Sequence, residues 1–334
     1  MIEIIATGDT TLRTAGKYCE EDILVKVPSG GGGGGDDEMK ASFIGVLDGA
    51  MANPVLPDGL TSIRNYCFYI NKGIVEPILP ESVTSIGEYA FYGCTYLARI
   101  SLPSGVTKIN RSTFEMCGQL VDISMEGVTD IGMYAFGSCT KLAPTSLPSS
   151  IKSISSYAFD GCSNLALTSL PNSITTISSN AFDGCSKLAL TSLPSGITTV
   201  NSYVFNGCTS LALTSLPDNV TSIGSRAFYG CSKLALTSLP SGITTVGTNA
   251  FENCTSLALT SLPSSITTIS SNAFSTCTGI TTLTFEGKPT SIASNAFIYC
   301  RNITTINVPW AEGEVKNAPW GATKATINYN YTGG

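Results

Sequence analysis

Apolar residues recur along most of the chain at a fixed spacing, and the positions between them are mostly Ser, Thr, Asn and Gly. The stretch LALTSLP occurs letter for letter at 165–171, 188–194, 211–217, 234–240 and 257–263, so successive copies lie 23 residues apart. A fixed period of this length indicates a solenoid, in which each unit buries its apolar side against its neighbours.

Each repeat reads L-x-x-[IT]-x-L-P-x-x-[IV]-T-x-[IV]-x-x-x-A-F-x-x-C-x-x. The leucines indicate a strand, and the following proline ends it because proline has no N–H to donate to a ladder. The β-branched I-T-T-I segment favours a second extended piece. The pattern therefore predicts a β-rich repeat solenoid of about eleven 23-residue coils, with Ala, Phe and Cys inside a closing turn.

The recurring phenylalanine and cysteine, three residues apart, are expected to form a core ladder. A free cysteine behaves as a small buried apolar residue. Stacked coils place such cysteines in a row roughly 5 Å apart, with parallel side chains that do not suit disulfide geometry. A straight row of thiols is also no tetrahedral metal site. The predicted ladder comprises Phe159, Phe182, Phe205, Phe228, Phe251, Cys162, Cys185, Cys208, Cys231 and Cys254.

The middle leucine of LALTSLP is predicted to face outward. In the related stretch LARISL, strand alternation sends Ile100 and Leu102 inward and Arg99 outward. The same register places the middle leucines on the surface and threonines such as Thr168 inside. The alternative is a local bulge that turns the leucine in and the threonine out. The outward reading predicts an apolar partner-binding stripe made of Leu167, Leu190, Leu213, Leu236 and Leu259.

Composition narrows the function classes. The 334 residues are 43% apolar and 13% charged, with a formal net charge of −6 and no basic run, which argues against a nucleic-acid partner. No apolar run approaches the roughly 20 residues of a membrane-spanning helix, so membrane insertion is not expected. The first residues do not match a secretory signal peptide.

No residue pattern marks a catalytic site, a cofactor or a bound metal. Histidine is absent, and with it the commonest general base. Serine–lysine or paired-carboxylate chemistry has no motif here but stays open. The rows of threonine that include Thr175 and Thr198 are similar to ice-binding arrays, and their alternative is ordinary solvent-facing strand residues. We expect a protein that is not an enzyme.

The flanks of the repeats differ from them. Residues 1–29 contain the alternating segment DILVKV and predict a small N-terminal attachment module. Residues 30–40, six glycines followed by acidic residues, predict a flexible linker. The solenoid is predicted over 41–308, with 41–57 as its N-terminal cap. Residues 309–334 are predicted to cap the other end, because an open solenoid end exposes an apolar section; Trp310, Trp320, Tyr329 and Tyr331 would cover it. The alternative for these rings is a carbohydrate-stacking site.

The segment LPESVTSIGEYAFYGC at 79–94 resembles the BspA-like, treponemal type of leucine-rich repeat. The likeness covers about 56–308 and implies a right-handed leucine-rich-repeat array. For function it implies only a binding or scaffolding surface, because such repeats serve varied ligands.

The terminal segments are similar to short stretches of structural proteins from phages and prophages of Firmicutes. This resemblance rests on TLRTAGKYCEEDILVKVPSGGGGG near the N-terminus and on the residues after Val308. It implies a virion component, associated with the tail, that displays the repeats and contacts other virion proteins through 1–29. The alternative is a bacterial cell-surface adhesin. The expected partner is a protein or a cell-surface glycan, and self-association is also open.

Overall fold

The computed structural model describes residue 56 and residues 58–333, and the predicted N-terminal module, linker and most of the N-terminal cap lie outside them. The chain divides into two compact units, Met1–Leu142 and Ala143–Gly334. In the residues that the structure describes, both units are built of parallel β-solenoid turns, about 12 of roughly 23 residues in all, and there is no helix among them. The predicted fold class is confirmed.

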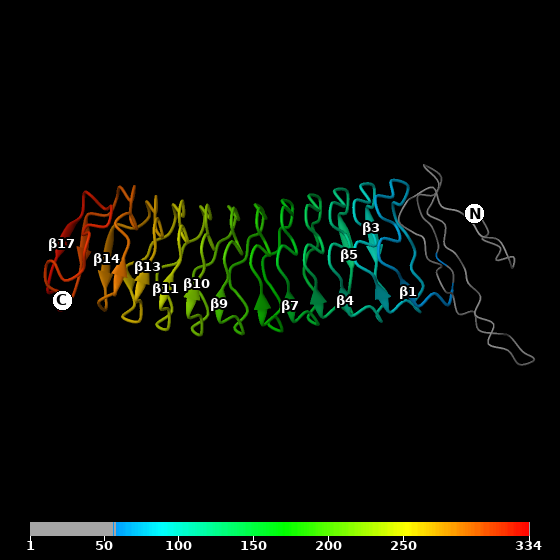
Figure 1. Ribbon diagram of the computed structural model, residues 1–334, viewed down its shortest axis with the longest axis horizontal. Coiled ribbons are helices and arrows are strands. Elements are labelled where there is room, and N and C mark those ends of the chain that lie inside the picture. The colour runs from blue at the N-terminus through cyan, green and yellow to red at the C-terminus, as the bar shows by residue number, and fades with distance from the viewer. Residues whose placement is uncertain (1–55, 57, 334) are drawn as a thin grey trace, which may run out of the picture. The chain divides into compact units, whose positions relative to one another are not determined.

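The described residues of the first unit form six short strands in two columns (Figure 1). β1 pairs with β2 and β4 with β6, all parallel and each formed by the second extended piece of a coil. β3 pairs with β5 in the same way and belongs to the leucine–proline segment. The strands are β1 Ser62–Ile63, β2 Ser85–Ile86, β3 Arg99–Ser101, β4 Lys108–Ile109, β5 Asp122–Ser124 and β6 Asp130–Ile131.

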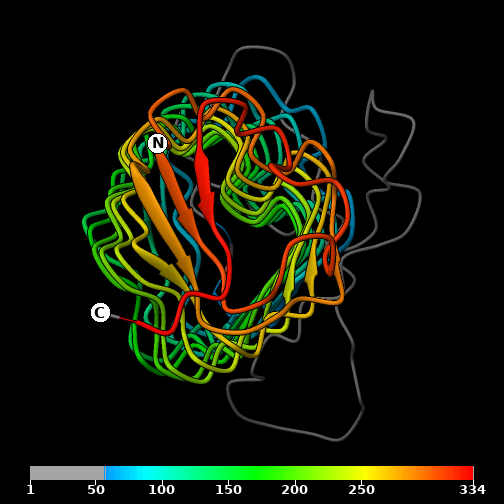
Figure 2. The ribbon, with the colours of Figure 1, turned by 90° about the vertical axis from the view of Figure 1, so that its left-hand side faces the viewer.

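The second unit repeats this plan. Its I-T-T-I strands pair in parallel in the order β9, β10, β11, β13 and β15, and β7 pairs with β8. Its leucine–proline strands form a separate sheet of β12, β14, β16 and β17, seen in orange and red along the coils in Figure 2. The strands are β7 Ser153–Ile154, β8 Thr176–Ile177, β9 Thr199–Val200, β10 Ser222–Ile223, β11 Thr245–Val246, β12 Ser261–Leu262, β13 Thr268–Ile269, β14 Thr282–Phe285, β15 Ser291–Ile292, β16 Thr305–Asn307 and β17 Thr326–Asn328.

Paired residues of neighbouring strands are separated in the chain by the length of one repeat. Ser222 lies opposite Thr245, and Thr245 lies opposite Thr268, so each strand pairs with its own copy one coil later. Identical residues therefore form columns through each unit, and one favourable interior residue is used again in every coil.

Stacked phenylalanines form the centre of each coil's interior. In the second unit the ring centroids of neighbouring coils lie 5.1–5.8 Å apart, as for Phe159 and Phe182 at 5.4 Å and Phe274 and Phe297 at 5.1 Å. The rings are nearly parallel and fully buried. Burying a side chain of this size is worth roughly 1.5–3 kcal/mol, and the stack gains this once per coil.

The C-terminal residues pack against the last coils. Trp310 and Trp320 are buried, with ring centroids 5.3 and 5.8 Å from that of Phe285. β17 extends the sheet by pairing with β16. The two indoles cannot stack on a sugar because their rings are covered, and the boundary of the cap at 309–334 stays a prediction.

Candidate binding surfaces

The predicted leucine stripe is wrong. Leu167, Leu190, Leu213 and Leu236 are 0% exposed and Leu259 is 1% exposed, so all five side chains belong to the core. The threonines that follow them, Thr168, Thr191, Thr214, Thr237 and Thr260, are exposed. The alternative orientation, with leucine in and threonine out, describes the coil.

The physical reason is a change in the backbone. Arg99–Ser101 forms a regular strand, β3, whereas the backbone bends at Thr168 and the preceding residues form no strand. The amide of Ala189 donates to the carbonyl of Leu167 at 3.0 Å, so the coils stay bonded to one another across the bend. A leucine gains roughly 1.5–3 kcal/mol by burial, and a threonine hydroxyl would lose its bonds to water there. These five leucines therefore cannot form a contact face.

The turn around each phenylalanine is the third side of the coil and has an unusual backbone. Tyr157 and Gly161 adopt positive φ angles of 60° and 70°. Their amides donate to the carbonyls of Ser179 and Asp183 in the next coil, and Phe159 donates to Ala181. Positive φ is thus part of the ladder that joins the coils, and it recurs in nearly every described coil.

Two positions of this turn vary in residue type from coil to coil, and their side chains are at least partly exposed in most coils, Ser112 and Ser275 being buried exceptions. We call the position two residues before each core phenylalanine the first turn position, and the residue directly after that phenylalanine the second turn position. The first turn position has positive φ and holds Tyr66, Tyr89, Ser112, Tyr134, Tyr157, Asn180, Tyr203, Arg226, Asn249 and Asn272. Asparagine tolerates this conformation well, whereas a larger side chain costs more. The tyrosines and the arginine are therefore not there for the backbone.

Four tyrosines form a two-by-two array on the turns of the first described coils, which we call the tyrosine face. Tyr66 stacks on Tyr89 and Tyr69 stacks on Tyr92, each with ring centroids 5.0 Å apart. Across the pairs, Tyr66 and Tyr69 lie edge to face at 5.6 Å, and Tyr89 and Tyr92 lie 5.8 Å apart. The side chain of Ile70, which follows Tyr69 in the same turn, is 48% exposed. The backbone of Ile70 has a positive φ of 54°.

Charged groups border the tyrosine face. The guanidinium carbon of Arg111 lies 6.0 Å from the ring centroid of Tyr89. Partial burial, the carboxylate of Glu115 and the neighbouring Tyr69 and Tyr89 raise the pKa of Tyr92. Its hydroxyl therefore stays protonated at neutral pH and can donate a hydrogen bond. The sequence contains a signal for this face, because tyrosine stands at both turn positions of two successive coils. That signal predicts a surface only once the structure shows that these side chains point outward.

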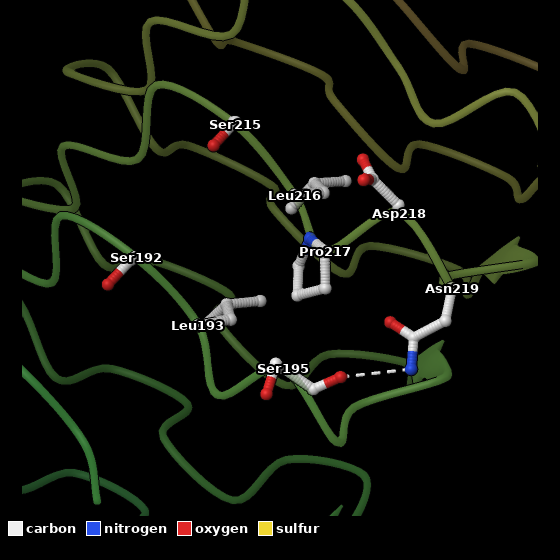
Figure 3. A pocket seen from close by; sticks show the side chains of 8 residues that line it. All are labelled: Ser192, Leu193, Ser195, Ser215, Leu216, Pro217, Asp218 and Asn219. Atoms are coloured by element: carbon white, nitrogen blue, oxygen red, sulfur yellow. Dashed lines mark hydrogen bonds between the residues drawn. The ribbon is translucent and has the colours of Figure 1, made fainter. Parts of the chain in front are cut away.

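A surface hollow of about 460 Å³ lies in the second unit between two neighbouring leucine–proline corners (Figure 3). The side-chain amide of Asn219 donates to the carbonyl of Ser195 at 2.9 Å, and Ser192 and Ser215 point the same way one coil apart. The lining of the hollow offers hydroxyls and one carboxylate but no aromatic ring. Its lining is Ser192, Leu193, Ser195, Ser215, Leu216, Pro217, Asp218 and Asn219.

The rows of threonine are exposed, but their hydroxyls are partly occupied. Thr244 donates to the carbonyl of Thr221 at 3.3 Å, and Thr267 donates to that of Thr244 at 3.1 Å. The hydroxyls therefore join neighbouring coils, as expected of ordinary strand residues in a solenoid.

A model of the BspA type leucine-rich repeat region matches residues 49–165, 122–235 and 198–318 of the chain. The chain belongs to the BspA-type leucine-rich repeat family. Its matched residues include both the tyrosine face and the LALTSLP coils.

Several solved structures are similar to this BspA-type chain. A leucine-rich cell surface protein from Faecalibacterium prausnitzii is 27% identical, with 79% of this chain and 89% of that chain covered and a TM-score of 0.48. A leucine-rich repeat protein from Bacteroides ovatus is 23% identical over 83% and 91% of the two chains, with a TM-score of 0.42. The leucine-rich repeat protein of T. pallidum is 29% identical over 62% and 78%, with a TM-score of 0.34. No curated protein matches the chain.

The described thiols of this BspA-type chain do not form a reactive site. The eleven described cysteines are buried as thiols. Burial raises the pKa of Cys94 and of Cys300 to about 12 and raises that of Cys185 well above its usual value. Within the described residues no group of three or more His, Cys, Asp or Glu could hold a metal ion, and no helix there is long and apolar enough to cross a membrane.

Proposed function

We propose that this chain is a non-enzymatic recognition protein displayed at a bacterial cell surface, and that its tyrosine face contacts the partner. The observation that carries the proposal is the stacking of Tyr66 on Tyr89 and of Tyr69 on Tyr92, at 5.0 Å in both cases. Membership of the BspA-type repeat family supports the surface location, since the family is associated with bacterial surface proteins.

The chemistry of the tyrosine face suits recognition. A tyrosine presents a large apolar ring and a polar tip and loses little conformational freedom on binding. Here each ring is already held by its neighbours, so less ordering remains to oppose binding. Interfaces are enriched in such anchors. The core does not require them, because other coils place Asn180 and Asp183 at the same positions.

The experiment is an adhesion assay with beads that carry the purified chain, on a panel of immobilised extracellular-matrix proteins and glycans. The double variant Tyr89→Asn, Tyr92→Asp keeps residue types that other coils use in this turn. The matched control Tyr299→Gly removes a tyrosine that is 60% exposed, at a position where other coils carry glycine. Loss of adhesion in the double variant alone supports the proposal. Retained adhesion, or a wild type that adheres to nothing, refutes it.

The alternative setting is a phage or prophage virion, in which the repeats would be displayed at the tail. Its support is the resemblance of residues 1–29 and of the segment after Val308 to phage structural proteins. Mass spectrometry of particles purified after prophage induction tests it. The chain in stoichiometric amounts with tail proteins supports a virion role, and its presence only in the cell-envelope fraction supports the surface role.

A further inference from the structure

A second cluster of aromatic and basic side chains lies on the turns of the second unit. The guanidinium carbon of Arg226 lies 5.6 Å from the ring centroid of Tyr203 and 5.4 Å from that of Tyr229. Tyr203 and Arg226 occupy the first turn position of successive coils, and Tyr229 occupies the second. We call these three residues the Arg226 cluster.

The cluster departs from its surroundings in a region where the coils are otherwise nearly identical. The first turn position holds Asn180 before the cluster and Asn249 after it, at φ angles of 60° and 57°. Arg226 has the same backbone, with φ 53°. A non-glycine residue in this conformation costs about 1–2 kcal/mol, and asparagine is the exception. Asparagine is sufficient for the fold at this position. The arginine therefore supplies a property that the fold does not require.

That property is an oriented cation. Arg226 is exposed, and two rings hold its guanidinium by cation–π contact. Within the part of the chain that the structure describes, Arg226 forms no ion pair, unlike Arg99, which pairs with Glu76. The planar guanidinium of Arg226 can donate two parallel hydrogen bonds to a carboxylate. Because the two rings already restrain the side chain, it loses little conformational freedom on binding.

We propose that the Arg226 cluster binds a carboxylate from an acidic segment of a partner protein. The guanidinium receives the carboxylate, and the rings of Tyr203 and Tyr229 hold the guanidinium in place. A protein segment suits the cluster better than a sugar, because Arg226 already covers one face of each ring and a sugar stacks on a free face. Arginine and tyrosine are also the residue types that carry much of the energy of protein–protein interfaces.

Each test variant carries a residue that other coils of this chain have at the same position. Arg226→Asn places in this coil the residue that Asn249 supplies in the next one, so the turn geometry is retained. The control Lys233→Ser removes one positive charge from the same coil and copies Ser210 and Ser256 of the neighbouring coils. Equal melting temperatures of the wild type and both variants establish that any difference in binding is not a folding defect.

The probe is a fluorescent 12-residue peptide of Glu and Asp, compared with its Gln and Asn counterpart. We expect the acidic peptide to bind the full chain, the neutral one not to bind, and Arg226→Asn to weaken binding on the order of tenfold. Lys233→Ser should have less than about twofold effect. Equal losses in the two variants, or no binding of the acidic peptide, overturn the proposal. Hyaluronate, a carboxylated polysaccharide, is tested in the same way. The proposal is also overturned if hyaluronate binds through Arg226 and the acidic peptide does not. The cluster shares no residue with the tyrosine face, so either proposal can fail alone.

Discussion

The thiol of Cys185 donates a hydrogen bond to the carbonyl oxygen of Phe159, one coil earlier, at 3.1 Å. The same bond joins Cys208 to Phe182 and Cys231 to Phe205 at the same length. The two predicted columns of the interior are thus bonded to each other. The carbonyl of Phe159 also accepts from the amide of Cys162 in its own coil, so the thiol of Cys185 adds a second bond that joins two coils. An alanine at this position could not make that bond.

The first prediction concerns alkaline pH. The pKa of Cys94 is raised to about 12 and that of Cys185 is also raised, while an unfolded thiol titrates near about 8.5. The folded state therefore favours the protonated thiol. Its stabilising effect is complete below about pH 8.5 and is lost as the pH rises toward the folded pKa, at about 1.4 kcal/mol per pH unit for each thiol. Urea unfolding between pH 7 and pH 10.5 should show a steep fall.

The matched control replaces Cys185, Cys208 and Cys231, whose pKa values are all raised by burial, by alanine. This variant is less stable at pH 7, but its stability should fall less steeply with pH because three titrating groups are gone. All other ionisable groups are the same in both proteins. Identical slopes would contradict the assignment of the alkaline loss to the thiols.

The second prediction concerns thiol chemistry. The thiolate is the reactive species, and the eleven described cysteines are buried. With an aromatic disulfide reagent at pH 8, we expect those thiols to react only after unfolding in urea. Cys19 lies outside the described residues, and the variant Cys19→Ser shows how much of the labelling is due to that thiol. Rapid labelling of several thiols in the folded Cys19→Ser protein would show that the ladder opens.

The third prediction reverses the role first given to the middle leucines. Leu213→Ala should lower the free energy of unfolding by about 2–5 kcal/mol, because it leaves a cavity between coils. Thr214→Ala, at the adjacent exposed position, should stay within about 0.5 kcal/mol of the wild type. The urea midpoints of the two variants measure this. A destabilised Thr214→Ala beside an unchanged Leu213→Ala would restore the outward orientation.

The fourth prediction tests the aromatic stack. Phe205 lies 5.8 Å from Phe182 and 5.7 Å from Phe228 between ring centroids. Phe205→Ala should cost about 3–5 kcal/mol, visible as a lower melting temperature. Tyr203→Asn, two residues away on the outer side of the same turn, is the control and should melt as the wild type does. An unchanged melt of Phe205→Ala would place the ring outside the cooperative core.

The interior of the coils could be predicted from the sequence because it repeats. A solenoid places the same residue in the same environment every 23 residues, so Phe182 and Cys185 are read together with all their copies. The binding surfaces could not be predicted in this way. Their chemistry lies in departures from the repeat, such as Arg226 among asparagines, and a single sequence does not say which departures face outward.

By itself the sequence determined the period, the order of strand, corner and turn, and the core columns of phenylalanine and cysteine, because these apolar residues recur at a fixed spacing in nearly every variant of the repeat. Only the tertiary structure decided the orientation of Leu167 and Thr168. Strand alternation assumes a regular backbone, whereas the folded coil bends at Thr168 to bury the leucine and keeps its bonds to the next coil. The stacking of Tyr66 on Tyr89 was likewise decided by the distance between coils, which brings residues 23 apart in the chain into contact.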